Sequence, residues 1–366
     1  MCVPVSRVAR VLLLIGALLL ALGAPIGVRA EGLAAPDLTP PLPAGLAYVT
    51  GGALSTPTVW AARPGGREAR RLGAGQEPLL ADSGRAVAVT AFSPGLQEQG
   101  PAVVIYSTVG GTPSSYLSLA TATAQPLAWS PDSRYLAVAL QSTSPSGEAG
   151  SGLAVIDIDT GVVATIASGA VHGASFAPDG SDRIVYGLAR SLALAAPVNL
   201  YIAQPDGSGT RALTSDGRSL YPLWGPRYIA YDRERRRSEA PEYQIWLIAP
   251  SGGGTRRLTH VGVDPLVWGL VPLAFSASGG RLLAEFGGQD TSEAWTVLVA
   301  SGRARRILVR GQPVMAAGIS RDGRTLLIDE GALGDPPSDG RIASIPFSGG
   351  AAKLLIGHGS QASWNG

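Results

Sequence analysis

Residues Gln125–Ser168 read QPLAWSPDSRYLAVALQSTSPSGEAGSGLAVIDIDTGVVATIAS, and they form the unit that the rest of the chain repeats. The stretch contains four apolar runs, each too short for a helix, and apolar residues alternate with others in runs such as Val155–Ile158. Ser130–Ser133 (SPDS) and Asp159–Gly161 (DTG) predict turns, because Pro fixes φ, Asp caps its own backbone and Gly accepts a positive φ. These features predict one four-stranded antiparallel sheet. Such a sheet cannot bury both faces alone, so we expect it to stack on copies of itself.

An aromatic or large apolar residue before the turn marks each copy of this unit. Successive anchors lie 44 to 51 residues apart, and each is followed by a related turn and by further short apolar runs. A period of about 40–50 residues with four strands per copy is typical of a β-propeller. The anchors are Leu80, Trp129, Phe176, Trp224, Phe275, Ile319 and Trp364.

The two ends of the repeat region complement each other. The first copy begins at its second strand, Leu46–Thr50, and the last copy stops after a first strand, Gln361–Trp364. We expect these two strands to pair, because pairing closes the ring and removes open sheet edges. The predicted fold class is therefore all-β: residues 45–366 form a seven-bladed β-propeller of four-stranded antiparallel blades, closed by the C-terminal strand on the N-terminal blade.

The first 44 residues predict export. Arg7 and Arg10 precede the apolar run 11–24, and small residues stand before Glu31, so residues 1–30 are predicted to be a signal peptide. A retained membrane anchor is the alternative, but Pro25 limits the apolar run to about fourteen residues, fewer than the roughly 20 needed to span. Residues 31–44 read as a Pro-rich linker. The predicted location is extracytoplasmic, periplasmic or secreted, with no membrane span after cleavage of the leader.

Composition argues against several classes of partner and cofactor. The formal net charge is +2, and it becomes −1 without residues 1–30, which carry three arginines and no acid, so we expect no nucleic-acid partner. The one cysteine, Cys2, lies in the leader, which excludes disulfides and Cys-based metal sites from the mature chain. We expect no metal and no other cofactor, because the histidines His172, His260 and His358 fall in different copies without ligand spacing. We expect a monomer.

Several motifs resemble the WD-like repeat of the TolB family of propellers. They are WSPDSRYLAV at residues 129–138, GTRALT at 209–214 and GTRRLT at 254–259, and the resemblance covers roughly residues 45–366. It implies a periplasmic or secreted propeller that binds proteins or other ligands. The chain differs from TolB itself in having no α/β domain before the propeller and in carrying seven copies rather than six.

Parity along the first strand of each copy predicts a channel. The residue before each anchor is mostly small and is assigned to the channel wall. Two residues earlier on the same face, a ring of residues should surround the channel mouth, and its polar members are Glu77, Tyr221 and Gln361. We predict that these three bind a ligand together with His172, which falls near the same end. The alternative is that they only bond loop backbone.

The connections between the second and third strands open on the same face and are long, which favours binding there. They are residues 93–101, 141–152, 189–198, 232–243 and 331–340. The charged stretch Asp232–Glu242 is the most unusual, and Asp232, Arg233, Arg235 and Arg236 are predicted to form a docking patch for an acidic partner. A solvated, self-paired loop is the alternative. Arginines on the fourth strands, such as Arg256 and Arg305, are assigned to solubility at blade edges.

Three functions remain open. The preferred one is an exported, non-enzymatic propeller that binds a protein, peptide or cell-envelope component through the long-loop face. The second is a propeller enzyme, a glycan lyase or lactone hydrolase, which would use His172 or Glu77 at the channel mouth. The third is a regulatory propeller that works for a separate hydrolase. The chain has no Gly-x-Ser-x-Gly motif, and no residue is assigned a catalytic role.

Overall fold

A computed structural model describes residues 45–51, 56–91, 102–109, 115–117, 122–143, 149–190, 196–236, 241–262, 267–288, 291–331 and 340–364. The predicted signal peptide and linker lie outside these ranges. The described residues form β-strands and turns and contain no helix, so the prediction of an all-β chain is confirmed. Within the same ranges, no helix is long and apolar enough to cross a membrane.

The strands fall into antiparallel sets of four, named here by their strands. The first set contains β1 (Leu46–Thr50), β2 (Thr58–Arg63), β3 (Arg67–Ala74) and β30 (Ser360–Trp364). The next two contain β4 (Gln76–Leu80), β5 (Ala86–Ala91), β6 (Ala102–Ser107) and β7 (Ser115–Leu117), and β8 (Ala122–Trp129), β9 (Tyr135–Thr143), β10 (Ala149–Asp157) and β11 (Val163–Ser168). The fourth contains β12 (Ala170–Phe176), β13 (Ile184–Ala189), β14 (Val198–Ala203) and β15 (Arg211–Ala212).

The remaining strands follow the same pattern. One set contains β16 (Ser219–Trp224), β17 (Ile229–Arg236), β18 (Pro241–Ile248) and β19 (Arg256–Arg257), and the next contains β20 (Val267–Phe275), β21 (Arg281–Gly288), β22 (Ser292–Leu298) and β23 (Arg303–Arg306). A single parallel bridge between Tyr243 and Gly269 joins these two sets into one eight-stranded sheet. A short hairpin, β24 (Leu308–Val309) and β25 (Gln312–Pro313), precedes β26 (Met315–Ile319), β27 (Thr325–Asp329), β28 (Ile342–Pro346) and β29 (Lys353–Ile356).

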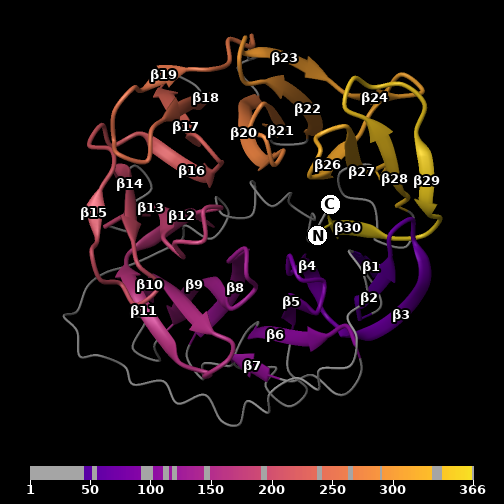
Figure 1. Cartoon of the computed structure of the whole chain (residues 1–366), viewed down its shortest axis with the longest axis horizontal. Helices are drawn as coiled ribbons and strands as arrows, with labels where there is room; N and C mark the ends of the chain where they lie inside the picture. Colours follow the sequence, from indigo (N-terminus) through magenta and orange to yellow (C-terminus); the bar gives the residue numbers. More distant parts are fainter. Residues whose placement is uncertain are drawn as a thin grey trace.

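The sets are arranged radially around a common centre, with β4, β8, β12, β16, β20, β26 and β30 innermost (Figure 1). This arrangement is that of a β-propeller. The last strand of the chain, β30, pairs antiparallel with β1 in the register Leu46 to Trp364, Ala47 to Ser363 and Val49 to Ser360. The first set is therefore built from both ends of the repeat region.

Side chains fix the turn between the first and second strands. Ser130 Oγ accepts the amide N–H of Tyr135 at 2.8 Å, and Asp132 Oδ1 accepts the amide of Arg134 at 3.0 Å. The same two bonds recur at Ser320 and Asp322, at 3.0 and 2.9 Å. In these two turns the serine that follows the anchor therefore holds the turn together with the Asp, whereas Ala177 stands at the same position before Pro178 and Asp179.

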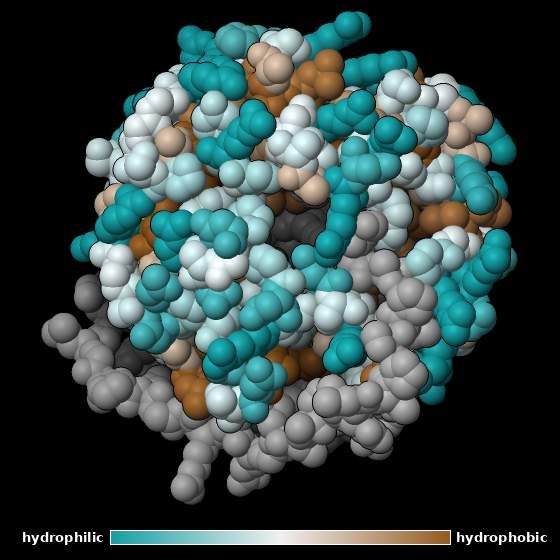
Figure 2. Space-filling view, viewed as in Figure 1, coloured by the Kyte–Doolittle hydropathy of each residue, from teal (hydrophilic) through white to brown (hydrophobic). Residues whose placement is uncertain are grey.

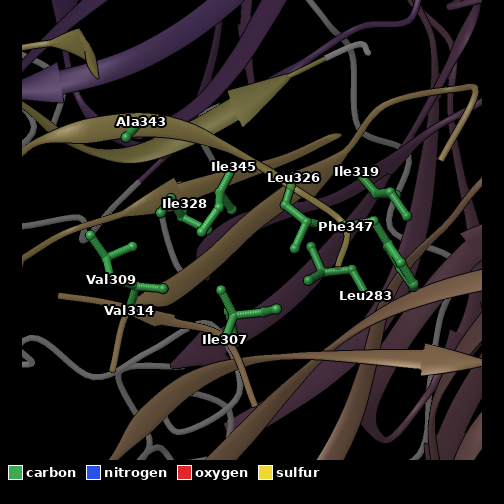
Figure 3. Packing of buried hydrophobic residues seen from close by; sticks show 11 residues of the cluster. Leu283, Ile307, Val309, Val314, Ile319, Leu326, Ile328, Ala343, Ile345 and Phe347 are labelled. Atoms are coloured by element: carbon green, nitrogen blue, oxygen red, sulfur yellow. The ribbon is translucent and has the colours of Figure 1, made fainter. Parts of the chain in front are cut away.

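Apolar side chains fill the space between neighbouring sets. Figure 3 shows one such interface, in which Leu283 of β21 packs with Ile319, Leu326 and Phe347 from the following set. Ile319 is a predicted anchor, and Phe176 and Trp224 lie in the equivalent clusters, so these anchors do wedge between the sheets. Each fully buried aliphatic or aromatic side chain contributes about 1.5–3 kcal/mol, which makes these interfaces the main source of stability.

Arginines on the outermost strands also join neighbouring sets. Four of them occupy the same register position, opposite the third-strand residues Ala61, Ile202, Leu247 and Thr296. Each guanidinium donates to a backbone carbonyl at the outer corner of the following set, and we call this position the arginine brace. The bonds run from Arg70 to Ser107 (3.1 Å), from Arg211 to Pro250, from Arg256 to Val299 (3.3 Å) and from Arg305 to Ser348 (2.5 Å). These residues therefore hold sheets together, beyond the solubility role expected for them.

Candidate binding face at the mouth of the channel

In every set, the pairing between the innermost strand and the second strand is interrupted by a shift of register. The shift lies at the same height in each set, on the N-terminal side of the anchor residue. In β4 the shift falls between Gln76 and Leu79, and in β16 it falls between Leu220 and Leu223. The predicted mouth residues sit inside these bulges: Glu77, Tyr221 and Gln361 have φ angles of 55°, 47° and 54°. Left-handed backbone is uncommon outside glycine, and bulges re-aim side chains near functional sites. We call this level the bulge ring.

A chain of hydrogen bonds links four successive sets through the bulge ring. Gln125 Nε2 donates to Glu77 Oε2 at 3.1 Å, and the Glu77 amide donates to Gln361 Oε1 at 2.8 Å. The Gln361 amide in turn donates to Asp329 Oδ2 at 2.9 Å. The structure therefore brings Glu77 and Gln361 together, and it adds Gln125 and Asp329, which the sequence analysis missed.

A second level of residues, four of them polar, lies on the second strands and faces the following set. The position is three residues beyond the partner of each anchor, and we call it the belt. It is occupied by Val49, Thr90, Ala139, Gly187, Asp232, Glu285 and Asp329. Aligning these strands by their anchors would have revealed the three carboxylates at one level from the sequence alone.

The belt carboxylates differ in whether they find a donor. Asp329 accepts the amide of Gln361, the bulge residue of the following set, and Glu285 accepts the hydroxyl of Ser292 at 2.6 Å. Asp232 is 0% exposed, and neither of its carboxylate oxygens has a hydrogen-bond partner among the residues that the structure describes. The bulge residue of the set that follows Asp232 is Pro272, which has no N–H to donate.

Thr90 is a second belt residue that is followed by a proline at the bulge position of the next set. Its buried hydroxyl has no hydrogen-bond partner in the described part of the chain, and the corresponding bulge residue of the next set is Pro126. The two belt side chains that lack a partner are thus the two that precede a proline. Burial raises the pKa of the Asp232 carboxyl well above its usual range, since nothing compensates the charge.

His172 and Tyr221 form a buried pair beside this region. Their rings meet edge to face with centroids 6.1 Å apart, and the side chains are 7% and 8% exposed. Neither His172 Nδ1 nor the Tyr221 hydroxyl has a partner among the described residues. Burial lowers the pKa of His172 to about 4, and burial, then Tyr243 and Asp232, raise the pKa of Tyr221 well above its ordinary value. Both predicted residues therefore lie beneath the surface of the mouth rather than at its rim.

The charged stretch Asp232–Glu242 is not the loop that the sequence suggested. Strands β17 and β18 continue through it, pairing Arg235 with Glu242 and Arg236 with Pro241, so only residues 237–240 remain outside the described strands. The placement of Asp232 in a docking patch is wrong, because its side chain is fully buried. Alternation along β17 points it toward the next set, on the same side as Ala230.

The arginines of this hairpin have different surroundings. Arg233 makes a 2.8 Å salt bridge to Asp216, and its guanidinium lies 4.6 Å from the Trp246 ring centroid. Arg235 is exposed, and the side chain of Arg236 lies outside the described part. Two cationic side chains are therefore presented by a strand pair that extends toward the mouth, and Arg233 is already engaged.

Most of the long connections lie outside the described residues. Residues 93–100 and 332–339 are examples, and strands β9 and β10 extend further into the 141–152 connection than expected. On the face seen in Figure 2, the surface is hollowed at the centre of the ring, and hydrophilic residues predominate around the hollow. Within the described ranges, no three His, Cys, Asp or Glu side chains gather as a metal site would need. His260 and His358 are exposed and separate.

Comparison with known proteins places the fold. No protein-family model matches the chain, and no curated protein matches it. Among solved structures, the β-propeller domain of the Trilobed protease from Pyrococcus furiosus is similar with a TM-score of 0.59 and 13% identity, covering 86% of this chain and 95% of that one. A prolyl endopeptidase is similar with a TM-score of 0.56 and 13% identity. The match covers 87% of this chain and 50% of that enzyme, so this chain spans about half of its length.

TolB from Acinetobacter baumannii is also similar, with a TM-score of 0.51 and 15% identity over 88% of this chain and 67% of that one. At these identities the likeness concerns the fold alone. The radial four-stranded sets, the WD-like turns and these similarities agree: the chain is a β-propeller with a TolB-like fold.

Proposed function

We propose that this chain is an exported, non-enzymatic propeller whose seven blades form a closed ring. We propose that it binds a protein, peptide or cell-envelope component through its mouth face. The observation that carries the proposal is the bulge ring. Glu77, Tyr221 and Gln361 are held in left-handed backbone at one level around the centre, and such strain of about 1–3 kcal/mol per residue is concentrated at functional sites.

Closure supports a rigid binding platform. The pairing of β30 with β1 supports a ring in which the ends of the repeat region share one set, and seven anchors support seven blades. Export is supported by the sequence of residues 1–30. The intact mass of the exported protein tests it, since cleavage after Ala30 predicts a chain that begins at Glu31.

Chemistry at the mouth favours recognition of a partner with hydrogen-bonding and acidic groups. Gln125 and Glu77 are half-buried and carry amide and carboxylate groups at the mouth, and Arg235 is exposed on the β17–β18 hairpin, which extends toward the same end of another set. His172 Nδ1 and the Tyr221 hydroxyl make no hydrogen bond among the described residues, so this pair offers no proton relay for acid–base catalysis.

The experiment is partner capture from envelope extract with the immobilised chain. Arg235→Glu, together with Glu77→Gln, should remove the specific partner, whereas Lys353→Glu should not. Lys353 is a matched control, because it is an exposed cation on an outermost strand. A partner list that is unchanged by the mouth variants contradicts the proposal.

A second candidate is a propeller that serves a separate hydrolase. Its support is the similarity of the fold to a prolyl endopeptidase that is about twice as long as the matched region. The same capture distinguishes the two candidates, because this one requires the retained partner to be a hydrolase whose activity changes when the chain is added.

A further inference from the structure

The groove between the β8–β11 set and the β12–β15 set interrupts the arginine brace. The brace position of each set lies opposite one third-strand residue, and in β10 that residue is Val155, which pairs with Ala164 of β11. Four other sets carry arginine at this position, each bonded to the corner of the next set. Ala164 ends at Cβ and reaches no such carbonyl.

An open groove lies where this arginine would extend. Its volume is about 430 Å³, and it is lined by Ala164, by apolar side chains including Val155, and by the corner residues Gln204 and Pro205. This corner is the counterpart of those that accept the brace arginines elsewhere. The groove therefore offers a guanidinium the same surroundings that the chain gives to four of its own.

The charges at the groove match a cation. Asp157, Asp182 and Asp206 line it, and no basic residue does. Asp157 already pairs with Arg134 at 2.8 Å, and Asp206 accepts the Ser208 amide at 2.8 Å. The Asp182 carboxylate makes no hydrogen bond or salt bridge within the described ranges. Burial, followed by repulsion from Asp132, raises its pKa, and the nearby Arg134 offsets only part of this rise. A cation placed here would relieve that repulsion.

Another groove of the same kind provides an internal contrast. Between the β26–β29 set and the first set, the brace position is Lys353, and a groove of about 490 Å³ lies beside it. Arg321 and Lys353 line that groove with one carboxylate, Asp322, so its net charge is positive and disfavours a cation. The two grooves lie at equivalent junctions and differ in charge. Binding of a cationic side chain to the groove at Ala164 alone would therefore be due to the charge of that groove and not to its shape.

We propose that the groove at Ala164 binds an arginine side chain of a partner protein, which takes the place that the chain's own arginine fills at the other junctions. The groove is formed by turns at the end of the sheets opposite the bulge ring, because it includes Ser181 and Asp182 of a first-turn segment and the 204–208 corner. The inference is therefore independent of the mouth face. Its failure would leave the proposed function untouched.

Titration of the full chain with the peptide acetyl-Gly-Arg-Gly-amide tests this, with backbone amide NMR shifts as the readout. We expect saturable shifts at Ala164, Asp182 and Asp206 and none beside Lys353. The matched peptide with citrulline in place of arginine should bind at least about tenfold more weakly, because it keeps the shape and loses the charge.

Two variants of the groove and one control variant make the result decisive. Ala164→Arg should abolish peptide binding and raise the melting temperature, because the chain's own guanidinium then completes the brace. Asp182→Asn should weaken binding while leaving the fold intact, and Lys353→Ala should change nothing. Equal binding of the citrulline peptide, unchanged binding to Ala164→Arg, or shifts that map elsewhere would overturn the proposal. Shifts at Ala164 that depend on protein concentration without peptide would also overturn it, in favour of a second copy of this chain.

Discussion

Replacing Asp232 by valine should stabilise the protein, although it removes a carboxylate from the belt. A valine already occurs at this belt position in the first set, where Val49 is the equivalent residue. Asp232 is fully buried, and neither carboxylate oxygen has a donor within the described ranges. Leaving a buried polar group unsatisfied costs about 1–3 kcal/mol. Valine removes this cost, so we expect the free energy of unfolding to rise by about 1–3 kcal/mol.

The equivalent replacement at Asp329 should have the opposite sign. Asp329 accepts amide bonds from Gln361 at 2.9 Å and from Gly331 at 3.1 Å. Bonds to a charged acceptor contribute about 1.5–3 kcal/mol each, so Asp329→Val should lower the free energy of unfolding by about 3 kcal/mol or more. Urea unfolding measures both variants, as opposite shifts of the midpoint at an unchanged m-value.

The increase in unfolding free energy that Asp232→Val produces should become larger as the pH rises. The folded-state pKa of Asp232 is raised above the unfolded value of about 3.9, so the folded chain holds a proton that the unfolded chain releases. The stability of the wild type is therefore fully present below about pH 4 and falls as the pH rises toward the folded-state pKa. A destabilising effect of Asp232→Val, or a gain that does not depend on pH between 4 and 7, would refute the reasoning that the belt residue lacks a donor because a proline follows it.

Three further outcomes follow from the same geometry. The pKa of His172 is lowered to about 4, so the folded chain loses stability as the pH falls from about 6.5 toward 4. In urea unfolding at pH 4 and pH 7, His172→Leu should remove about 3 kcal/mol of the difference in unfolding free energy between the two pH values. An unchanged difference would contradict the burial argument. Arg256→Ala should lower the free energy of unfolding by about 1 kcal/mol by deleting a brace bond, whereas Lys353→Ala should leave it unchanged; equal effects would remove the brace as a cause. Gln361→Ala should cost about 1 kcal/mol by leaving the Glu77 amide without its acceptor, and it should speed hydrogen exchange of that amide; an exchange rate equal to that of the wild type would rule this out.

The pattern of short runs and Pro-Asp turns was enough to predict the strands, because alternation and turn chemistry are local properties. Strand β10 shows the limit of that reasoning. Its apolar core at Leu153–Ile158 was recognisable, but the strand begins at Ala149, where Gly and Ser carry no periodic signal and pairing with β9 decides the conformation.

The candidate site was harder to predict, for a physical reason. Parity placed Glu77, Tyr221 and Gln361 in one column, but it assumed regular strands, and the bulges turn these residues into left-handed backbone. Charge density in Asp232–Glu242 suggested a solvated loop, whereas five of the eight cross-strand pairs between β17 and β18 involve residues of this stretch. Local composition cannot reveal such pairing, because the partner strand supplies the driving force.

The central claim, that the two ends of the repeat region join in one sheet, is tested most directly by hydrogen exchange of β1. The structure pairs Leu46, Ala47 and Val49 with β30, so their region should exchange slowly in the full chain and much faster in a chain that ends at Gly359. If β1 exchanges as fast in the full chain as in the shortened one, β30 does not pair with it in solution, and the closed ring is contradicted.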